Sequence, residues 1–296
     1  MPRSITVTVS GATGQQGGAL ARLLLGRGHR VRALTRRPGS RPARDLRDLG
    51  ADVYEADLAD GDAVQEATEG ADSFFLMATP YEAGLEAEIR QACAAAEAAK
   101  VAEVKHLVYS SVASADQRTG IPHFDSKREV EIYIQKLGVP YTIVGPVFFM
   151  ENLLGPMFSD GLRGGTLSMP LPPDRPLQVI AVEDIARFVC LAMERPTEFQ
   201  GRRIDIAADA LTGPEMAKAI AATGRTVGYV QAPLDSVRSW SADLARMWEW
   251  FDQVGYRVDI EKLWGYPEVG WHDFREWARR QDWSIVDQAG AEQPSA

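Results

Sequence analysis

The sequence predicts an α/β fold, a doubly wound parallel sheet followed by a smaller C-terminal α/β domain, and three observations lead to this prediction. Short apolar runs rich in β-branched residues alternate with helical patterns over the first 150 residues. These runs are almost continuously apolar, which is typical of parallel strands covered by helices on both faces. A glycine-rich segment directly follows the first run. Right-handed crossovers between such strands produce a doubly wound sheet.

The elements of the first part follow from the spacing of apolar residues and from the glycines and polar residues that interrupt it. Strands are predicted over residues 5–10, 31–35, 51–56, 73–78, 106–111 and 141–146. Helices are predicted over residues 17–27, 62–68, 86–100 and 126–137.

The composition and periodicity of the sequence change after Pro146. Residues 151–178 are rich in Gly, Pro and Met and show no clear period, so we interpret them as an insertion that walls a pocket. A helix over 182–194 and a strand over 202–207 are predicted to return to the sheet. A second helix, a strand and an aromatic-rich helical region are then predicted over 214–222, 227–231 and the residues up to 285, before a flexible tail over 286–296.

Composition excludes several classes of function. The chain has 296 residues, a net charge of −9 and a pI near 5.1, which argues against nucleic acid as a partner. No run of 18 apolar residues occurs, and the N-terminus leads directly into a strand, so we expect a cytoplasmic protein with no signal peptide and no membrane span. Cys93 and Cys190 lie in apolar helical stretches and are expected to be packed free thiols, with no metal site.

The glycine-rich segment is the strongest indication of function. It lies between the first strand and the first helix and comprises Gly11, Thr13, Gly14, Gln15, Gln16 and Gly17. Glycines at this position let the backbone approach a pyrophosphate, which then rests on the amides of the helix N-terminus. The segment therefore predicts a Rossmann dinucleotide-binding domain over residues 1–150, to which 179–207 return. Residues 151–178 and 208–285 would then form the substrate-binding region.

The motif Gly-Ala-Thr-Gly-x-Gln-Gly resembles that of the NmrA-like subgroup of atypical short-chain dehydrogenases. The segments Gly145-Pro-Val-Phe-Phe-Met-Glu-Asn152 and Val182-Glu-Asp-Ile-Ala186 extend the resemblance, which spans about residues 5 to 285. Gly145 departs from it, because the family usually has Arg there. The resemblance implies either a redox-sensing regulator without turnover or a reductase of quinones, dyes or ketones.

The second strand indicates which dinucleotide binds. It ends in Thr35-Arg36-Arg37 without an acidic residue, and arginine can pair with a 2′-phosphate that a carboxylate would repel. We therefore expect NADP(H) rather than NAD(H). The resemblance adds further cofactor positions at the ends of later strands and in the segment against the nicotinamide: Asp57, Leu58, Ala78, Thr79, Lys127, Pro146 and Phe149.

Typical members of the short-chain dehydrogenase superfamily carry a Ser on the fifth strand. They carry a Tyr and a Lys four residues apart on the next helix, and the Tyr protonates the carbonyl of the substrate. Here Ser110 and Ser111 lie on the strand, and Lys127 follows His123 at the same spacing, so His123 replaces the tyrosine. Lys127 is expected to hold the nicotinamide ribose. His123 is either a proton donor or a structural residue. For Ser110 and Ser111 the alternatives are that one of them polarises a substrate carbonyl or that it caps the end of the strand.

Large, soft side chains are expected to line the substrate pocket. They are Tyr81, Phe148, Met150, Leu153, Met157, Phe158 and Met169, with Trp240 or Trp248 as further candidates. We interpret the chain as an NADPH-dependent reductase of a ketone, quinone or similar polycyclic acceptor. One alternative is a non-catalytic NADP(H) sensor that binds a protein partner, and a lesser one is an enzyme acting on imines or enones. The oligomeric state stays open.

Overall fold

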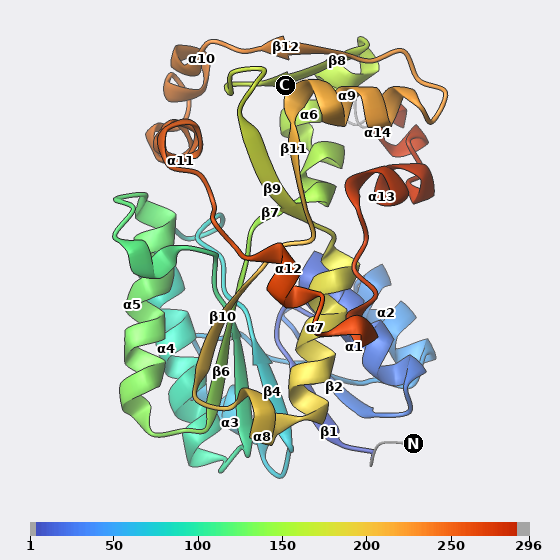
Figure 1. Ribbon diagram of the computed structural model, residues 1–296. Coiled ribbons are helices and arrows are strands. Elements are labelled where there is room, and N and C mark those ends of the chain that lie inside the picture. Colours follow the sequence, from blue (N-terminus) through green and yellow to red (C-terminus); the bar gives the residue numbers. More distant parts are fainter. Residues whose placement is uncertain (1–3, 289–296) are drawn as a thin grey trace, which may run out of the picture. The chain divides into compact units, whose positions relative to one another are not determined.

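The computed structural model describes residues 4–288 (Figure 1). The chain forms two compact units. Unit 1 contains Met1–Pro146 and Ile185–Asp205, and unit 2 contains Val147–Asp184 and Ile206–Ala296. All seven tryptophans of the sequence belong to unit 2. None of the helices in the described part of the chain is long and apolar enough to cross a membrane.

Unit 1 is built on a seven-stranded sheet with the order β10-β6-β5-β4-β1-β2-β3. The strands are β1 (Thr6–Val9), β2 (Arg30–Thr35), β3 (Asp52–Glu55), β4 (Ser73–Leu76), β5 (His106–Ser110), β6 (Tyr141–Pro146) and β10 (Arg202–Ile206). β1 pairs in parallel with both β2 and β4, and the pairs β2–β3, β4–β5 and β5–β6 are also parallel. The predicted doubly wound fold is confirmed. Its strand order reverses between β1 and β4, where ligands of such sheets bind beyond the carboxyl ends of the strands.

Helices cover both faces of this sheet (Figure 1). They are α1 (Gln15–Gly26), α2 (Arg41–Asp48), α3 (Gly61–Thr68), α4 (Leu85–Val101), α5 (Pro122–Leu137), α7 (Val182–Glu194) and α8 (Pro196–Phe199), with a short 3-10 helix η1 (Ala115–Gln117). A stripe of alanines on α4, including Ala92, Ala95 and Ala99, is buried against Phe74 and Leu107 of the sheet. Small side chains let α4 pack closely on the sheet.

Unit 2 contains two small sheets. In the first, β9 (Pro176–Ile180) lies between β7 (Phe148–Phe149) and β11 (Asp209–Thr212), and in the second β8 (Thr166–Met169) pairs with β12 (Gly228–Gln231). Its helical segments are η2 (Met150–Leu154), α6 (Pro156–Arg163), α9 (Gly213–Ala221), α10 (Leu234–Arg238), α11 (Ala242–Gln253), α12 (Ile260–Leu263), η3 (Pro267–Val269), α13 (Phe274–Arg280) and α14 (Ser284–Gln288).

Several predicted boundaries differ from those observed. The insertion over 151–178 is regular rather than irregular, because it contains most of η2, all of α6 and β8, and the start of β9. Residues 179–184 belong to unit 2, since β9 pairs with β7 and β11. Helix α2 was not predicted, and α5 begins at Pro122, four residues earlier than expected. The predicted tail begins too early: residues 286–288 lie in α14, and 289–296 lie outside the described residues.

Candidate functional site

The glycine loop between β1 and α1 has the geometry that a bound phosphate requires. Gly11 has a φ of 57°, in the left-handed region that favours glycine. A Cβ on Gly17 would lie 2.6 Å from the Ser10 carbonyl oxygen and 2.6 Å from the Gly11 carbonyl carbon. Because both obstacles are backbone atoms, only glycine fits at position 17 without moving the loop.

The start of α1 is open to an anion. Its N-cap residue, Gly14, contributes no side-chain cap, and the first turn contains no acidic residue. Gly14 and Gln15 are exposed, and Thr13 is half-buried. The first amides of a helix lack intrahelical partners and carry the positive end of its dipole. This loop therefore fits the pyrophosphate of a dinucleotide.

The Ser110 side chain is bonded to the glycine loop. Its hydroxyl, at the end of β5, donates to Oε1 of Gln16 at 2.7 Å. Of the two sequence alternatives for Ser110, this bond supports a structural role at the strand end. It also gives Gln16 a function that the motif alone did not reveal, since Gln16 links the loop to β5.

The end of β2 presents two exposed arginines. Arg36 forms an ion pair with Glu82 at 2.6 Å, and both side chains are more than half exposed. The backbone N–H of Arg37 donates to Oγ1 of Thr35 at 3.1 Å. At the end of β3, Oδ1 of Asp57 accepts the amide of Ala59 at 2.8 Å, beside Leu58. An anion that binds Arg36 would therefore have to displace the carboxylate of Glu82.

Lys127 lies in a buried polar cluster that the motif did not indicate. Its Nζ is 2.7 Å from Oε1 of Glu88 and donates to the Ala78 carbonyl at 2.5 Å. Oε2 of Glu88 accepts the Ser126 hydroxyl at 2.7 Å. The ammonium also lies 5.7 Å from the ring centroid of Tyr109. Lys127 is therefore held at the carboxyl end of β4, beside the predicted cofactor position Ala78 and the adjoining Thr79.

Ser111 belongs to a second buried cluster. Its hydroxyl donates to Oε1 of Glu131 at 2.5 Å, and Nε of Arg203 donates to both oxygens of Glu131 at 3.0–3.1 Å. Nη1 of Arg203 also contacts Asp205 at 2.5 Å. Burial raises the pKa of Asp205 to about 6, although Arg203 lowers it. The structure thus gives Ser111 a partner inside the protein.

Tyr109 is no substitute for the missing catalytic tyrosine. Its side chain is fully buried on β5, and within the described residues its hydroxyl has no hydrogen-bond partner. Burial, with help from Glu88 and Glu131, raises its pKa well above the usual value. His123 lies in the first turn of α5, half-buried, with its ring edge-on to Phe124 at 4.9 Å.

Glu88 and Glu131 were not predicted as site residues, although the sequence contains one signal for them. Glu88 falls four residues before Ala92, in line with the buried alanine stripe of α4, and Glu131 lies between buried positions of α5. An acidic residue on an apolar helix face requires a buried partner. Which partner it finds depends on which helices pack together, and that information is not local.

The residues predicted to line a substrate pocket are partly buried in the core and partly exposed on the surface. Phe148, Met150, Leu153, Phe158 and Met169 are buried in unit 2. Phe148 packs there against Phe158 and against Trp248 of α11, so these side chains form a core in which aromatic rings interlock. By contrast, Tyr81, Met157 and Trp240 are exposed. Of the remaining cofactor positions, Pro146 ends β6 in unit 1 and Phe149 lies on β7 in unit 2.

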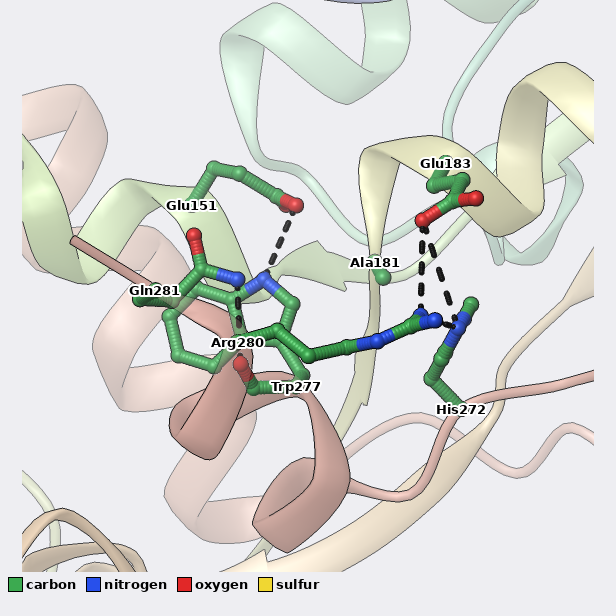
Figure 2. Close-up of a pocket in the computed structure, with 7 residues that line it drawn as sticks. All are labelled: Glu151, Ala181, Glu183, His272, Trp277, Arg280 and Gln281. Carbon is green, nitrogen blue, oxygen red and sulfur yellow. Dashed lines mark hydrogen bonds and ion pairs between the residues drawn. The ribbon is translucent and has the colours of Figure 1, made fainter. Parts of the chain in front are cut away.

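A polar cavity of about 300 Å³ lies within unit 2 (Figure 2). It is lined by Glu151, Ala181, Glu183, His272, Trp277, Arg280 and Gln281, and by none of the seven residues predicted for the pocket. Figure 2 shows Glu151 beside Trp277 at one end and Glu183 with His272 at the other, with Arg280 extended between them.

The side chains of this cavity bond to one another and to neighbouring residues of α7. Glu151 accepts Nε1–H of Trp277 and the amide of Val182, both at 3.0 Å. Nδ1 of His272 lies 2.5 Å from buried Asp184, which also accepts the His272 amide at 2.9 Å. Burial raises the pKa of Glu151. These contacts join the start of α7 to α13 and to the segment before it, so they stabilise unit 2.

His29, Cys190 and Glu194 place three potential metal ligands within 4.8 Å of one another in unit 1. Nδ1 of His29 accepts the amide of Ile5 at 3.3 Å, while Nε2 faces Glu194 at 3.0 Å. Nε2 therefore carries the proton of the neutral ring, whereas a metal on Nε2 would need it on Nδ1. Arg27 already pairs with Glu194 at 2.9 Å. The cluster fits an ion-pair network better than a metal site.

Comparison with known proteins gives consistent matches. The model of the NmrA-like family matches residues 3–278. The NmrA-like oxidoreductase cpsB of Aspergillus campestris is 34% identical over 262 residues, which cover 76% of this chain and 75% of that protein. An NAD(P)H azoreductase of Xenophilus azovorans is 31% identical, over 78% and 79% of the two chains. The structure of the negative transcriptional regulator NmrA in complex with NADP superposes with a TM-score of 0.79, at 25% identity over 97% and 98% of the chains.

Proposed function

Because the chain belongs to the NmrA-like family, we propose that it is an NADP(H)-dependent reductase whose acceptor is a conjugated ring such as a quinone. The observation that carries the proposal is the glycine loop, in which a Cβ at Gly17 would meet backbone atoms at 2.6 Å. That constraint, together with the uncapped start of α1, supports a pyrophosphate there.

The preference for NADP(H) is supported by Arg36 and Arg37, which are exposed at the end of β2 where an NAD-binding protein would have an acid. The similarity to an NAD(P)H azoreductase and to NmrA in complex with NADP points the same way. When bound, the dinucleotide would supply a hydride. Lys127 of α5, whose ammonium donates to the Ala78 carbonyl after β4, is proposed to hold the nicotinamide ribose.

The proposed acceptor follows from the partners of the polar side chains. Reduction of a simple ketone produces an alkoxide that needs a proton donor. Ser110 and Ser111 donate to Gln16 and Glu131, and Tyr109 is fully buried, which leaves half-buried His123 as the candidate donor. A reduced quinone is a far more stable anion, so its formation does not need a protein acid. Ketones, imines and enones are therefore less favoured substrates.

The test is NADPH oxidation with a panel of quinones and of ketones of matched size and shape. We expect quinones to react at least tenfold faster than the matched ketones, because loss of general acid catalysis costs about a hundredfold. The choice of acceptor would be wrong if the ketones reacted as fast as the quinones. The reductase itself would be refuted if NADPH bound without being oxidised by any member of the panel.

That last result would support the second candidate, an NADP(H)-sensing regulatory protein. The observation in its favour is that Ser110, Ser111 and Lys127 are all bonded or paired to other residues of the protein. The likeness to a negative transcriptional regulator adds to it. A sensor would bind NADPH tightly, show no turnover, and change its affinity for a protein partner when the cofactor binds.

A further inference from the structure

We infer that Glu88 is a positioning residue for the dinucleotide, acting through Lys127. The inference rests on the proposed binding of NADP(H) and adds a residue that the glycine loop and the Ser–His–Lys pattern do not contain. Glu88 lies in the first turn of α4, and its side chain has no exposed surface. A carboxylate buried this completely requires bonded partners, because desolvation of a charge is costly.

The two oxygens of Glu88 contact α5 in different ways, Oε1 through an ion pair and Oε2 through a hydrogen bond. Oε1 faces Nζ of Lys127 at 2.7 Å, and Oε2 accepts the hydroxyl of Ser126 at 2.7 Å. Adjacent residues of one helix are thus held by one carboxylate. This arrangement restricts the Lys127 side chain, which would otherwise have many rotamers. It also directs the ammonium toward the end of β4.

The number of N–H donors on the Lys127 ammonium decides whether it can also bond a ligand. A lysine has three N–H donors and no acceptor. One N–H is donated to the Ala78 carbonyl, whereas Oε1 of Glu88, at 2.7 Å, lies within ion-pair distance of the ammonium but makes no hydrogen bond in the described part of the chain. The ammonium therefore keeps donor capacity for a ligand, and the side chain keeps 12% of its surface exposed. Lys127 can therefore give one hydrogen bond to a ribose hydroxyl without breaking either protein contact.

Glu88 also balances charge. The Lys127 ammonium would be nearly buried without a counter-ion if Glu88 were neutral, and it would then turn toward solvent. Lys127 would still be present but would no longer be aimed at the ribose. Loss of the Glu88 charge should consequently resemble loss of Lys127 itself in its effect on the cofactor.

The test is a double-mutant cycle with Glu88→Gln and Lys127→Met, in which the Kd for NADPH is measured by calorimetry. We expect each single variant to raise Kd at least fivefold. In the Lys127→Met background, Glu88→Gln should change Kd by less than twofold, because the two residues act as one unit. A Glu88 that only supports the fold would weaken binding by the same factor in both backgrounds.

Thermal unfolding of the four proteins provides a second readout. Lys127→Met leaves a buried carboxylate unpaired and should lower the Tm, and adding Glu88→Gln should recover most of that loss. The matched control is Glu97→Gln, on the same helix, which removes the charge of a carboxylate that accepts a hydrogen bond from Tyr133 of α5 and has no contact with Lys127 among those that the structure gives. It should leave Kd within twofold of the parent.

The inference is overturned if Glu88→Gln binds NADPH within twofold of the parent, or if its effect is the same with and without Lys127. It is also overturned if Glu97→Gln weakens binding as much as Glu88→Gln does. A parent protein that binds no NADPH would refute the proposed function first, before any variant is compared, and the inference with it.

Discussion

Single side chains at the ends of β2, β4 and β5 meet partners that the sequence motifs do not include. Arg36 meets Glu82, Lys127 meets Glu88, and Ser111 meets Glu131. In each case an acidic residue from another segment pairs with or accepts a hydrogen bond from a side chain that the motif assigns to the cofactor or the substrate. Two of these acids are fully buried, and Glu82 is exposed.

Changing Arg36 to Ala should erase most of the preference for NADPH. The parent is expected to bind NADPH at least tenfold more tightly than NADH, since a charged contact to the 2′-phosphate contributes about 1.4 kcal/mol or more. Calorimetry with both cofactors measures the ratio, which should fall below about threefold in the variant.

Glu82→Gln serves as the control for Arg36. It removes the negative charge that pairs with the guanidinium, so the preference for NADPH should be kept or increased. Equal affinity of the parent for both cofactors would contradict the assignment of Arg36.

Changing His123 to Ala should leave most of the activity with a quinone intact. His123 is the residue that replaces the usual tyrosine, but an acceptor with a stable reduced anion needs no donor. The rate is expected to stay within about threefold of the parent at several pH values, with an unchanged Kd for NADPH. A fall of about a hundredfold would instead identify His123 as a general acid.

Among the secondary-structure elements, the loop that begins α1 is the most constrained by its backbone. Changing Gly17 to Ala places a Cβ against backbone atoms of Ser10 and Gly11, so the loop must move. The Kd for NADPH should rise at least tenfold. Gly26→Ala at the other end of α1 is the matched control, because a Cβ there meets nothing within 4 Å. Similar losses in both variants would argue against a cradle formed by the loop.

Strands β5 and β6 are linked by a buried histidine that should make stability depend on pH. Nε2 of His106 lies 2.7 Å from Oγ1 of Thr142, whose hydroxyl donates to the Phe199 carbonyl, so Nε2–H is the donor. Burial lowers the pKa of His106 to about 4. The stabilising contribution of this neutral ring is therefore present above pH 6.5 and is lost as the pH falls toward 4.

Urea unfolding at several pH values tests this effect. Between pH 7 and pH 4 the parent should lose up to about 3 kcal/mol more than His106→Gln, given about 1.4 kcal/mol per pKa unit. The side chain of glutamine does not titrate, so its curve gives the contribution of all other groups. Identical pH dependence in the two proteins would show that His106 keeps an ordinary pKa.

Local pattern was sufficient for most elements of unit 1 and for the glycine loop. Strands buried on both faces give uninterrupted apolar runs, and the loop glycines are adjacent in sequence. The pairing of β9 with β7 and β11 was missed because it joins segments about 30 residues apart. The partners Glu88 and Glu131 were missed for a related reason, since helix packing decides them. The predicted pocket residues were large and apolar, and such residues serve equally well as core.

For the whole molecule, the glycine loop and Lys127 belong to unit 1, whereas the buried pair of Asp184 and His272 belongs to unit 2. Asp184 is fully buried and holds His272 through both its carboxylate oxygens. Changing Asp184 to Ala should lower the free energy of unfolding by about 3 kcal/mol, as expected when one partner of a buried polar pair is removed. The Kd for NADPH should stay within twofold, because the loop and Lys127 belong to unit 1.

Hydrogen exchange resolves where the effect falls. Protection should be lost around His272 and α13 while the strands of unit 1 keep theirs. Asp160→Asn, which removes an exposed ion pair with Arg163 in unit 2, should cause no measurable change. A loss of protection spread evenly over both units would mean that they unfold together.

The placement of all seven tryptophans in unit 2 divides the molecule spectroscopically. Indole emission reports on unit 2 alone, whereas far-ultraviolet circular dichroism sums the helices of both units. Denaturation curves recorded by the two signals would coincide only if the units unfold in one cooperative step. The unmodified protein thus carries a built-in label on the part of the chain that does not contain the glycine loop.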